Sequence, residues 1–292
     1  YVQRASSSPG TATFRLSRVL VVLTLSVSVS STLQAQSETI GISPVQTETT
    51  PLEELAYQRP SVFDSKSYIE AGYTTDHLTN GYKTWDSQYV NVFVPLKHRG
   101  LFNIQVDNVK RYGITDQAIS GVYAYPLTSG VLNVELSYAA NAVYLAKSSA
   151  GAVWNGKLPN AFGYTIGTSQ RQYLESQTAI YKLGLEKYLG NFRFAYTAIL
   201  STINGVQPAY AQLLQAQWVG ENLNKLGLSY SRGMEPMVVS PGTLASIKTN
   251  YLQVDGLYWI NKQVGLTTAL WHGMQGDFYQ RNGGQIGVRV AF

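Results

Sequence analysis

Histidine is the side chain best suited to acid–base catalysis near neutral pH, and this chain has three, His77, His98 and His272. A histidine that activates a serine would give a nucleophile for hydrolysing or transferring an acyl group. The spacing His-x-Ser is missing at two of them, because Thr79 follows His77 and Met274 follows His272 at that distance. The first interpretation is therefore that these histidines are polar residues without a catalytic role. The second is that one of them serves a lipid-modifying acyl hydrolase or transferase.

Metal and cofactor chemistry has less support. The chain contains no cysteine, which excludes disulfides, thiolate metal sites and cysteine nucleophiles. Asp76 with His77, or His272 with Asp277, could supply oxygen and nitrogen ligands, but no two histidines have a ligand spacing. The glycines of "NGG" and "GMQGD" lack the strand–helix unit of a phosphate loop and are expected in turns. We expect no metal site and no cofactor.

Charge is low and unevenly placed along the 292 residues. Lysine and arginine number 22 against 17 acids, but Arg4, Arg15 and Arg18 fall in the first 35 residues, which hold no acid. The remainder has 19 bases against 17 acids, so no nucleic-acid partner is expected. Charged residues make up 13% of the chain, about half the share of a soluble domain, and there are 21 tyrosines. This composition is typical of a cell-envelope protein.

Residues 1–35 have the pattern of an export signal peptide. Arg15 and Arg18 precede the apolar run "VLVVLTLSVSVSS", and Ala35 ends "LQA" as a cleavage point. A membrane anchor is the alternative, but the run is too short and too rich in serine to span about 30 Å as a helix. Residues 36–66, rich in Ser, Thr, Glu, Gln and Pro, are expected to form a flexible periplasmic lead-in.

The rest of the chain, residues 67–292, repeats a pattern of about ten alternating residues followed by a turn. In "LFNIQVDNVK", for example, Phe102, Ile104 and Val106 alternate with polar residues, and the terminal "GGQIGVRVAF" alternates up to Phe292. The alternation predicts about fourteen strands, or twelve if 117–127 and 150–158 are discounted: roughly 67–75, 84–96, 101–112, 117–127, 131–140, 150–158, 162–172, 177–188, 192–202, 209–219, 225–235, 250–260, 264–272 and 284–292.

Turn lengths predict how these strands assemble. Tight connections alternate with longer ones such as 75–83, 235–250 and 273–285, which is typical of a closed antiparallel transmembrane β-barrel in the outer membrane. Closure requires the first and last strands to pair, because an open edge in lipid leaves backbone groups unsatisfied. We expect the N-terminus in the periplasm and the longer loops outside the cell. For the apolar 235–250 loop there are three alternatives: it folds inward as a constriction, it covers a binding cleft, or it packs on neighbouring loops.

In lipid, the polar face of each strand must turn inward. The charged residues expected to line the lumen are of mixed sign: Asp107, Glu135, Lys182, Glu186, Arg193, Asp255 and Arg289. Aromatic residues near strand ends are expected in girdles at the membrane surfaces: Trp85, Tyr123, Tyr125, Tyr188, Phe192, Trp218, Tyr258, Trp259 and Trp271. A water-soluble β-barrel or sandwich is the rival, and the low charge and the lack of a second apolar layer weigh against it.

The stretch "GLEKYLGNFRFAYTAIL" (184–200), preceded by "LPNAFGYTIGTSQRQYLES" (158–176), resembles the YaiO family of bacterial outer-membrane barrels. This resemblance covers roughly 67–292 and implies an outer-membrane location, a barrel fold and a link to surface polysaccharide export or biofilm. No catalytic residues follow from it. The terminal Val288, Val290 and Phe292 also resemble the signal that the barrel-assembly machinery recognises.

Taken together, these features predict an outer-membrane barrel that acts as a passive channel or envelope scaffold, with the lipid bilayer, the assembly machinery and surface polysaccharide as partners. The alternative is a lipid-modifying enzyme with a histidine at the outer rim, His77 or His272. His98 falls in a tight turn on the periplasmic side, away from the outer leaflet.

Overall fold

The computed structural model describes residues 66–96, 99–203, 208–220, 223–240 and 243–292, together with the two-residue strands β1 (Leu23–Thr24) and β2 (Gly41–Ile42), which pair with each other. The expected signal peptide and lead-in therefore lie almost wholly outside the described residues, and so does His98. Within the described ranges, no helix is long and apolar enough to cross a membrane.

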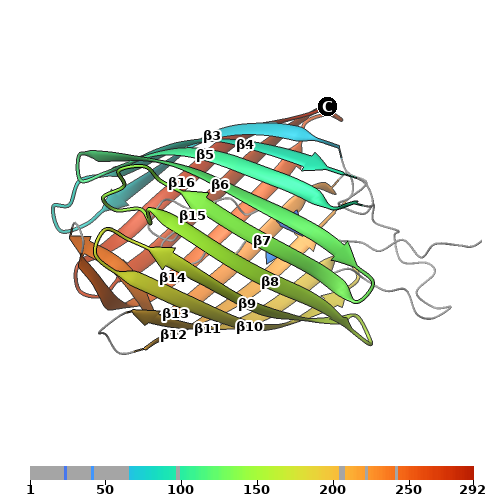
Figure 1. The fold of residues 1–292 in the computed structure, drawn as a ribbon. Helices are drawn as coiled ribbons and strands as arrows, with labels where there is room; N and C mark the ends of the chain where they lie inside the picture. The colour runs from blue at the N-terminus through green and yellow to red at the C-terminus, as the bar shows by residue number, and fades with distance from the viewer. Residues whose placement is uncertain are drawn as a thin grey trace, which may run out of the picture.

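Strands β3 to β16 form one closed antiparallel barrel (Figure 1). The two segments that alternate poorly, 117–127 and 150–158, form β6 and β8, so fourteen strands rather than twelve build the wall. The strands are β3 (Tyr68–Leu78), β4 (Trp85–Pro95), β5 (Leu101–Arg111), β6 (Ile114–Leu127), β7 (Gly130–Tyr138), β8 (Ser148–Leu158), β9 (Phe162–Gln172), β10 (Gln177–Leu189), β11 (Phe192–Ile203), β12 (Ala209–Val219), β13 (Lys225–Ser240), β14 (Thr243–Trp259), β15 (Val264–Gln275) and β16 (Tyr279–Ala291).

The barrel closes between its first and last strands. β16 pairs with β3 from Ala291 opposite Tyr68 to Arg281 opposite Leu78. The backbone N–H of Phe292 continues the ladder by donating to the carbonyl of Ser67 at 2.8 Å. Every strand of the wall thus has two neighbours and no edge is left open, which is the condition for strands to lie in lipid.

The two ends of the barrel differ. One end, called here the terminal end, holds the start of β3, Phe292 and the turns that follow the even-numbered strands β4 to β14. The opposite end, called here the cap end, holds the other connections. The longest of these that is fully described is 139–147. The expected long loops 235–250 and 273–285 are wrong, because β13 runs to Ser240, β14 begins at Thr243 and β16 begins at Tyr279. The alternation breaks in this hairpin because Glu235, Pro236 and Met237 are buried in succession and Leu244 packs with Tyr144, while the hydrogen-bond ladder continues.

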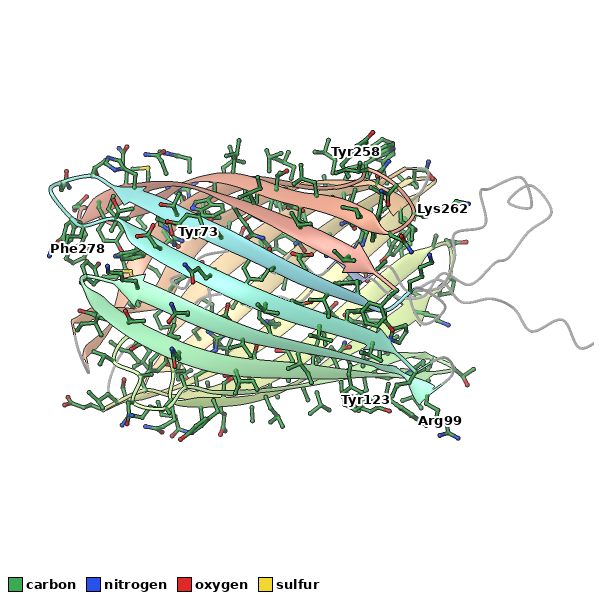
Figure 2. The ribbon with its side chains drawn as sticks, turned by 90° about the horizontal axis from the view of Figure 1, so that it is seen from above. Tyr73, Arg99, Tyr123, Tyr258, Lys262 and Phe278 are labelled. Atoms are coloured by element: carbon green, nitrogen blue, oxygen red, sulfur yellow. The ribbon has the colours of Figure 1, made fainter. Side chains whose placement is uncertain are left out.

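Side chains alternate between an outward apolar face and an inward polar face. Leu183, Leu185 and Leu270 are among the most exposed apolar residues, whereas Glu70, Asn91 and Gln105 are buried inside. Figure 2 shows Tyr123 and Tyr258 near the terminal end, as an aromatic girdle requires. The expected girdle positions of Trp85, Tyr188, Trp259 and Trp271 are wrong, because all four occupy inward positions of the alternation.

Candidate functional site

The seven charged residues expected to line the lumen all occupy inward positions on their strands. Asp107, Lys182, Glu186, Arg193 and Arg289 are buried, and Glu135 and Asp255 are partly exposed. Further inward charges lie on neighbouring strands and bring the two signs close to balance: the acids Glu70, Asp76, Asp116 and Glu235, and the bases Arg111, Arg171, Lys225 and Arg281.

Glu186 and Arg193 form an ion pair across the β10–β11 hairpin, with Arg193 Nε 2.7 Å from Glu186 Oε2. The hydroxyl of Tyr188 donates to the same carboxylate oxygen at 3.0 Å. The pairing follows from register, since Tyr188 stands opposite Arg193 and Glu186 opposite Ala195. Both charges are therefore neutralised locally and offer little net field to a solute.

A second network lies inside the closing seam, around Glu70 on β3. Arg289 on β16 binds this carboxylate at 2.6 Å, and the Tyr89 hydroxyl donates to it at 2.7 Å. Thr267 on β15 donates to the same carboxylate at 3.2 Å, and Gln285 donates to the Tyr89 hydroxyl at 2.8 Å. Four strands on both sides of the seam are thus joined by buried polar contacts.

A third network lies nearer the cap end, where Arg281 donates from Nε and Nη2 to the two oxygens of Asp76, at 2.7 and 2.8 Å. Trp271 Nε1 donates to Asp76 at 2.6 Å, and the Arg281 guanidinium lies 5.3 Å from the Trp85 ring centre. Sequence reasoning missed this pair because Asp76 and Arg281 fell in expected loops. The sequence did contain a signal for Arg281, because it is an even number of residues from Gln285 and Arg289 and therefore lies on the same face of the last strand.

The inner face is packed unevenly around the wall. On β15, β16, β3 and β4 the inward polar residues Thr267, Gln285, Thr74 and Asn91 are buried. On β6 to β9 the inward side chains near mid-strand are partly exposed instead: Ser120, Glu135, Val153, Thr165 and Ser169. Because these side chains point into the barrel, their exposure requires water-sized space beside this wall. Three of these five residues carry a hydroxyl group, Val153 is apolar and Glu135 is acidic.

The cap-end connection between β7 and β8, residues 139–147, is fixed to the wall by one carboxylate. Asp116, buried on β6, accepts backbone N–H groups from Val143, Tyr144 and Leu145 at 2.8 to 3.2 Å. Three N–H groups aimed at one carboxylate make charge-assisted hydrogen bonds. Ala139, Ala142 and Leu145 of this segment pack against Val109 of β5, so the segment, called here the cap segment, is both bonded and packed.

The cap segment reaches across the mouth. Tyr144 packs with Tyr173 of the β9–β10 connection, with Ile203 at the end of β11 and with Leu244 at the start of β14. Of these elements, β14 lies on the opposite side of the ring from β7. Its ring centre also lies 5.2 Å from that of Tyr112, between β5 and β6. Burial raises the pKa of the Tyr112 and Tyr144 phenols above their usual value, so both hydroxyls stay protonated at neutral pH. The rings of Tyr112, Tyr144 and Tyr173, with the aliphatic side chains packed against them, thus lie across the cap-end mouth.

The two described histidines lie on the outward face. His77 and Asp76 are adjacent on β3 and therefore point to opposite sides of the wall, which rules out their sharing a metal ion. His272 on β15 is exposed, and its Nδ1 lies 2.7 Å from Asn282 Oδ1 on β16. Among the described residues, no group of three or more His, Cys, Asp or Glu side chains could hold a metal ion. Val288, Val290 and Phe292 also point outward and are about half exposed or more.

A comparison with protein families matches residues 66–237 to the YaiO membrane beta barrel domain. The match covers more than half of the 292 residues. The chain belongs to the YaiO membrane β-barrel family. The family and the closed barrel together place this YaiO protein in the bacterial outer membrane, as the sequence predicted.

Solved barrels are similar to this YaiO barrel at low identity. A loop L8 deletion mutant of OmpT, an outer membrane protein of Vibrio cholerae, is 9% identical over 77% of this chain and 98% of its own, with a TM-score of 0.45. An anion-selective porin from Comamonas acidovorans is 9% identical over 77% and 98%, with a TM-score of 0.44. KdgM porin in complex with disordered oligogalacturonate is 8% identical over 76% and 99%, with a TM-score of 0.43. Among curated proteins, none matches the sequence. Likeness at this level says nothing of solutes or partners.

Proposed function

We propose that this outer-membrane barrel is a passive channel for small polar solutes with little preference for charge, closed at its cap end by residues 139–147 in the described conformation. The observation that carries the proposal is the partly exposed inner face of β6–β9, with Ser120, Thr165 and Ser169. The ion pairs of the inner wall lie on the neighbouring β10–β11 hairpin and in the β3–β16 seam. Paired charges of both signs neither attract nor repel one kind of ion strongly.

The cap segment sets the conditions under which solutes pass. Because one carboxylate, Asp116, holds three backbone N–H groups of the segment, removing it leaves those groups without their partner. The segment then loses these hydrogen bonds to β6 and keeps only its apolar packing and its other backbone bonds, while the ladder of the wall stays intact. Wild-type protein is therefore expected to pass solutes slowly, and the Asp116→Ala variant faster.

The test is the swelling of liposomes that contain the purified barrel, in solutions of neutral, anionic and cationic solutes of similar size. Asp116→Ala should raise the swelling rate at least several-fold over wild type for all three solutes, whereas Asp277→Ala, which removes an exposed acid at the same end, should not. No swelling with either wild type or Asp116→Ala would oppose the channel and favour an envelope scaffold, whereas equal, fast swelling of both would reject closure by the cap segment. The link to surface polysaccharide stays a prediction from the family, and an oligosaccharide is the larger solute with which to test it.

A lipid-modifying enzyme is the second candidate, favoured by one observation. His272 is held by Asn282 on the outward surface near the cap end, where an imidazole can meet the acyl or headgroup region of a lipid. A neutral imidazole oriented by a neighbour can act as a base. Release of acyl groups from labelled lipid that is lost in His272→Ala would support the enzyme, and unchanged or undetectable release in both would reject it.

The rest of the proposal concerns export, orientation and assembly of the barrel. Residues 1–35 act as the export signal and 36–66 as a periplasmic lead-in, with the terminal end of the barrel facing the periplasm and the cap end facing outward. The outward Val288, Val290 and Phe292 serve as the signal for the assembly machinery. Support comes from the signal-like pattern around Arg15 and Arg18 and from the alternation that runs to the last residue.

A further inference from the structure

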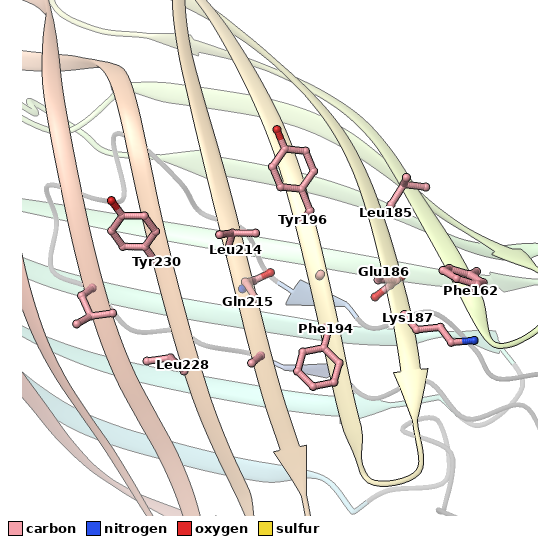
Figure 3. A pocket seen from close by; sticks show the side chains of 13 residues that line it. Phe162, Leu185, Glu186, Lys187, Phe194, Tyr196, Leu214, Gln215, Leu228 and Tyr230 are labelled. Carbon is pink, nitrogen blue, oxygen red and sulfur yellow. The ribbon is translucent and has the colours of Figure 1, made fainter.

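A hollow of about 520 Å³ lies on the outward surface of β9 to β14, well away from the lumen (Figure 3). The surface that borders it is mostly apolar, and the outward polar groups at its border are the Lys187 ammonium and the hydroxyls of Tyr196 and Tyr230. Outward positions of the barrel face lipid, so the hollow opens into the bilayer and not into water. Its mostly apolar lining suits a hydrocarbon chain.

The floor of the hollow is Ala216 on β12. In register across the wall, Phe194, Ala216 and Leu228 stand side by side, so a methyl group lies between two large side chains. The next row along the strands is Tyr196, Leu214 and Tyr230, and Figure 3 shows the two tyrosine rings on either side of Leu214. A single small residue therefore creates the depression, and its neighbours form the sides.

One cation stands at the end of the hollow nearest the β10–β11 turn. Lys187 is the cross-strand neighbour of Phe162 and of Phe194. Its ammonium lies 4.2 Å from the Phe162 ring centre and donates to the carbonyl of Asn160. An ammonium has three N–H donors, so donors remain for an anion. A lysine on the lipid-facing surface is tolerated near the interface, where phosphate groups of lipids lie.

We propose that this hollow is a binding site for one phospholipid, with an acyl chain over Ala216 and the phosphate at Lys187. A second copy of the chain is a poorer occupant, because the surface is a hollow with one cation at its rim, and that pattern matches the charge and shape of a lipid anion. The site lies in the leaflet next to the terminal end, since Lys187 is two residues from the end of β10.

The test is native mass spectrometry of the purified, folded barrel mixed with phosphatidylglycerol or with diacylglycerol carrying the same chains. Wild type should retain one phosphatidylglycerol and prefer it to diacylglycerol. Ala216→Phe fills the hollow and should reduce lipid retention by about tenfold or more. Lys187→Gln should bind both lipids equally, because only the headgroup contact is removed.

The matched control is Ala152→Phe, which adds the same ring to an exposed outward position of β8, outside the hollow. Heat-modifiable migration in gels confirms that each variant is folded. Unchanged retention in Ala216→Phe, an equal loss in Ala152→Phe, or a preserved headgroup preference in Lys187→Gln would each overturn the proposal. A dimer that replaces the lipid adduct would overturn it in favour of a second copy.

Discussion

Asp76 and Arg281 form a two-point ion pair across the seam that closes the barrel, although 205 positions separate them in sequence. Both side chains are nearly inaccessible, at 1% and 0% exposure. A buried charge without its partner is destabilising, so this ion pair favours the pairing of β3 with β16, which closes the barrel.

The first prediction concerns this pair. Asp76→Ala leaves the Arg281 guanidinium buried without its carboxylate, and we expect the free energy of unfolding to fall by about 3–5 kcal/mol. Urea unfolding in detergent, followed by tryptophan fluorescence, measures the change. Asp277→Ala, at an exposed acid of the same end, should stay within about 0.5 kcal/mol of wild type. Equal effects of the two variants would contradict the importance of the pair.

The second prediction concerns Gly287 on β16, whose inward face lies close to Tyr89 and Thr267 in the seam between β3 and β16. A methyl group on Gly287 would lie 2.5 Å from the Tyr89 hydroxyl and 2.5 Å from Thr267 Oγ1, two members of the Glu70 network. Gly287→Ala should therefore cost about 1–3 kcal/mol of stability through displaced neighbours. Gly121→Ala is the matched control, because its nearest atom, the Asn103 carbonyl oxygen, is 3.8 Å away. If both variants unfold at the same urea concentration, the packing described for the seam is wrong.

The third prediction separates assembly from stability. Phe292 is 67% exposed on the outward face, so its ring adds little to the interior of the barrel. Phe292→Ser should sharply reduce the amount of barrel inserted in cells while leaving refolding in detergent nearly unchanged. Phe102→Ser removes another outward ring and should not reproduce the loss in cells. Normal insertion of Phe292→Ser would reject the assembly signal.

Orientation in the membrane gives the fourth prediction. The chain has no cysteine, so one introduced thiol reports its own position. In intact cells, a membrane-impermeant maleimide should label Asp277→Cys at the cap end and spare Lys262→Cys at the terminal end, which should react only after the outer membrane is permeabilised. The reverse pattern would place the cap end in the periplasm.

The alternation of residues was sufficient to predict the barrel because period two is set by the backbone and holds wherever one face meets lipid. It predicted β5, β10 and β11 almost to the residue, since Phe102, Leu183 and Phe194 alternate with polar neighbours. It failed at the ends of β13, β14 and β16 nearest the cap, where apolar and polar residues no longer alternate. On β13 the run "PMVV" is apolar at successive positions, and at the start of β16 the outward Gln280 and Asn282 are polar.

Partners inside the barrel could not be predicted in the same way. Parity places Glu70, Asp76 and Arg281 inward, but which acid meets which base depends on register between distant strands and on side-chain reach. The role of Asp116 was invisible, because its three N–H donors come from a connection without periodicity. Alternation also cannot tell an inward tryptophan such as Trp85 from a girdle residue near a strand end.

The central claim is that outward side chains meet lipid and inward side chains meet a polar interior, and two adjacent residues of β6 test it most directly. Ile119 is 49% exposed on the outward face, and Ser120 points into the partly open side of the lumen. Single-cysteine variants at these two positions, labelled with bimane before refolding into liposomes, can be compared for quenching by brominated lipid. Strong quenching at position 119 and little at position 120 is the predicted result, and equal or stronger quenching at position 120 would contradict the claim.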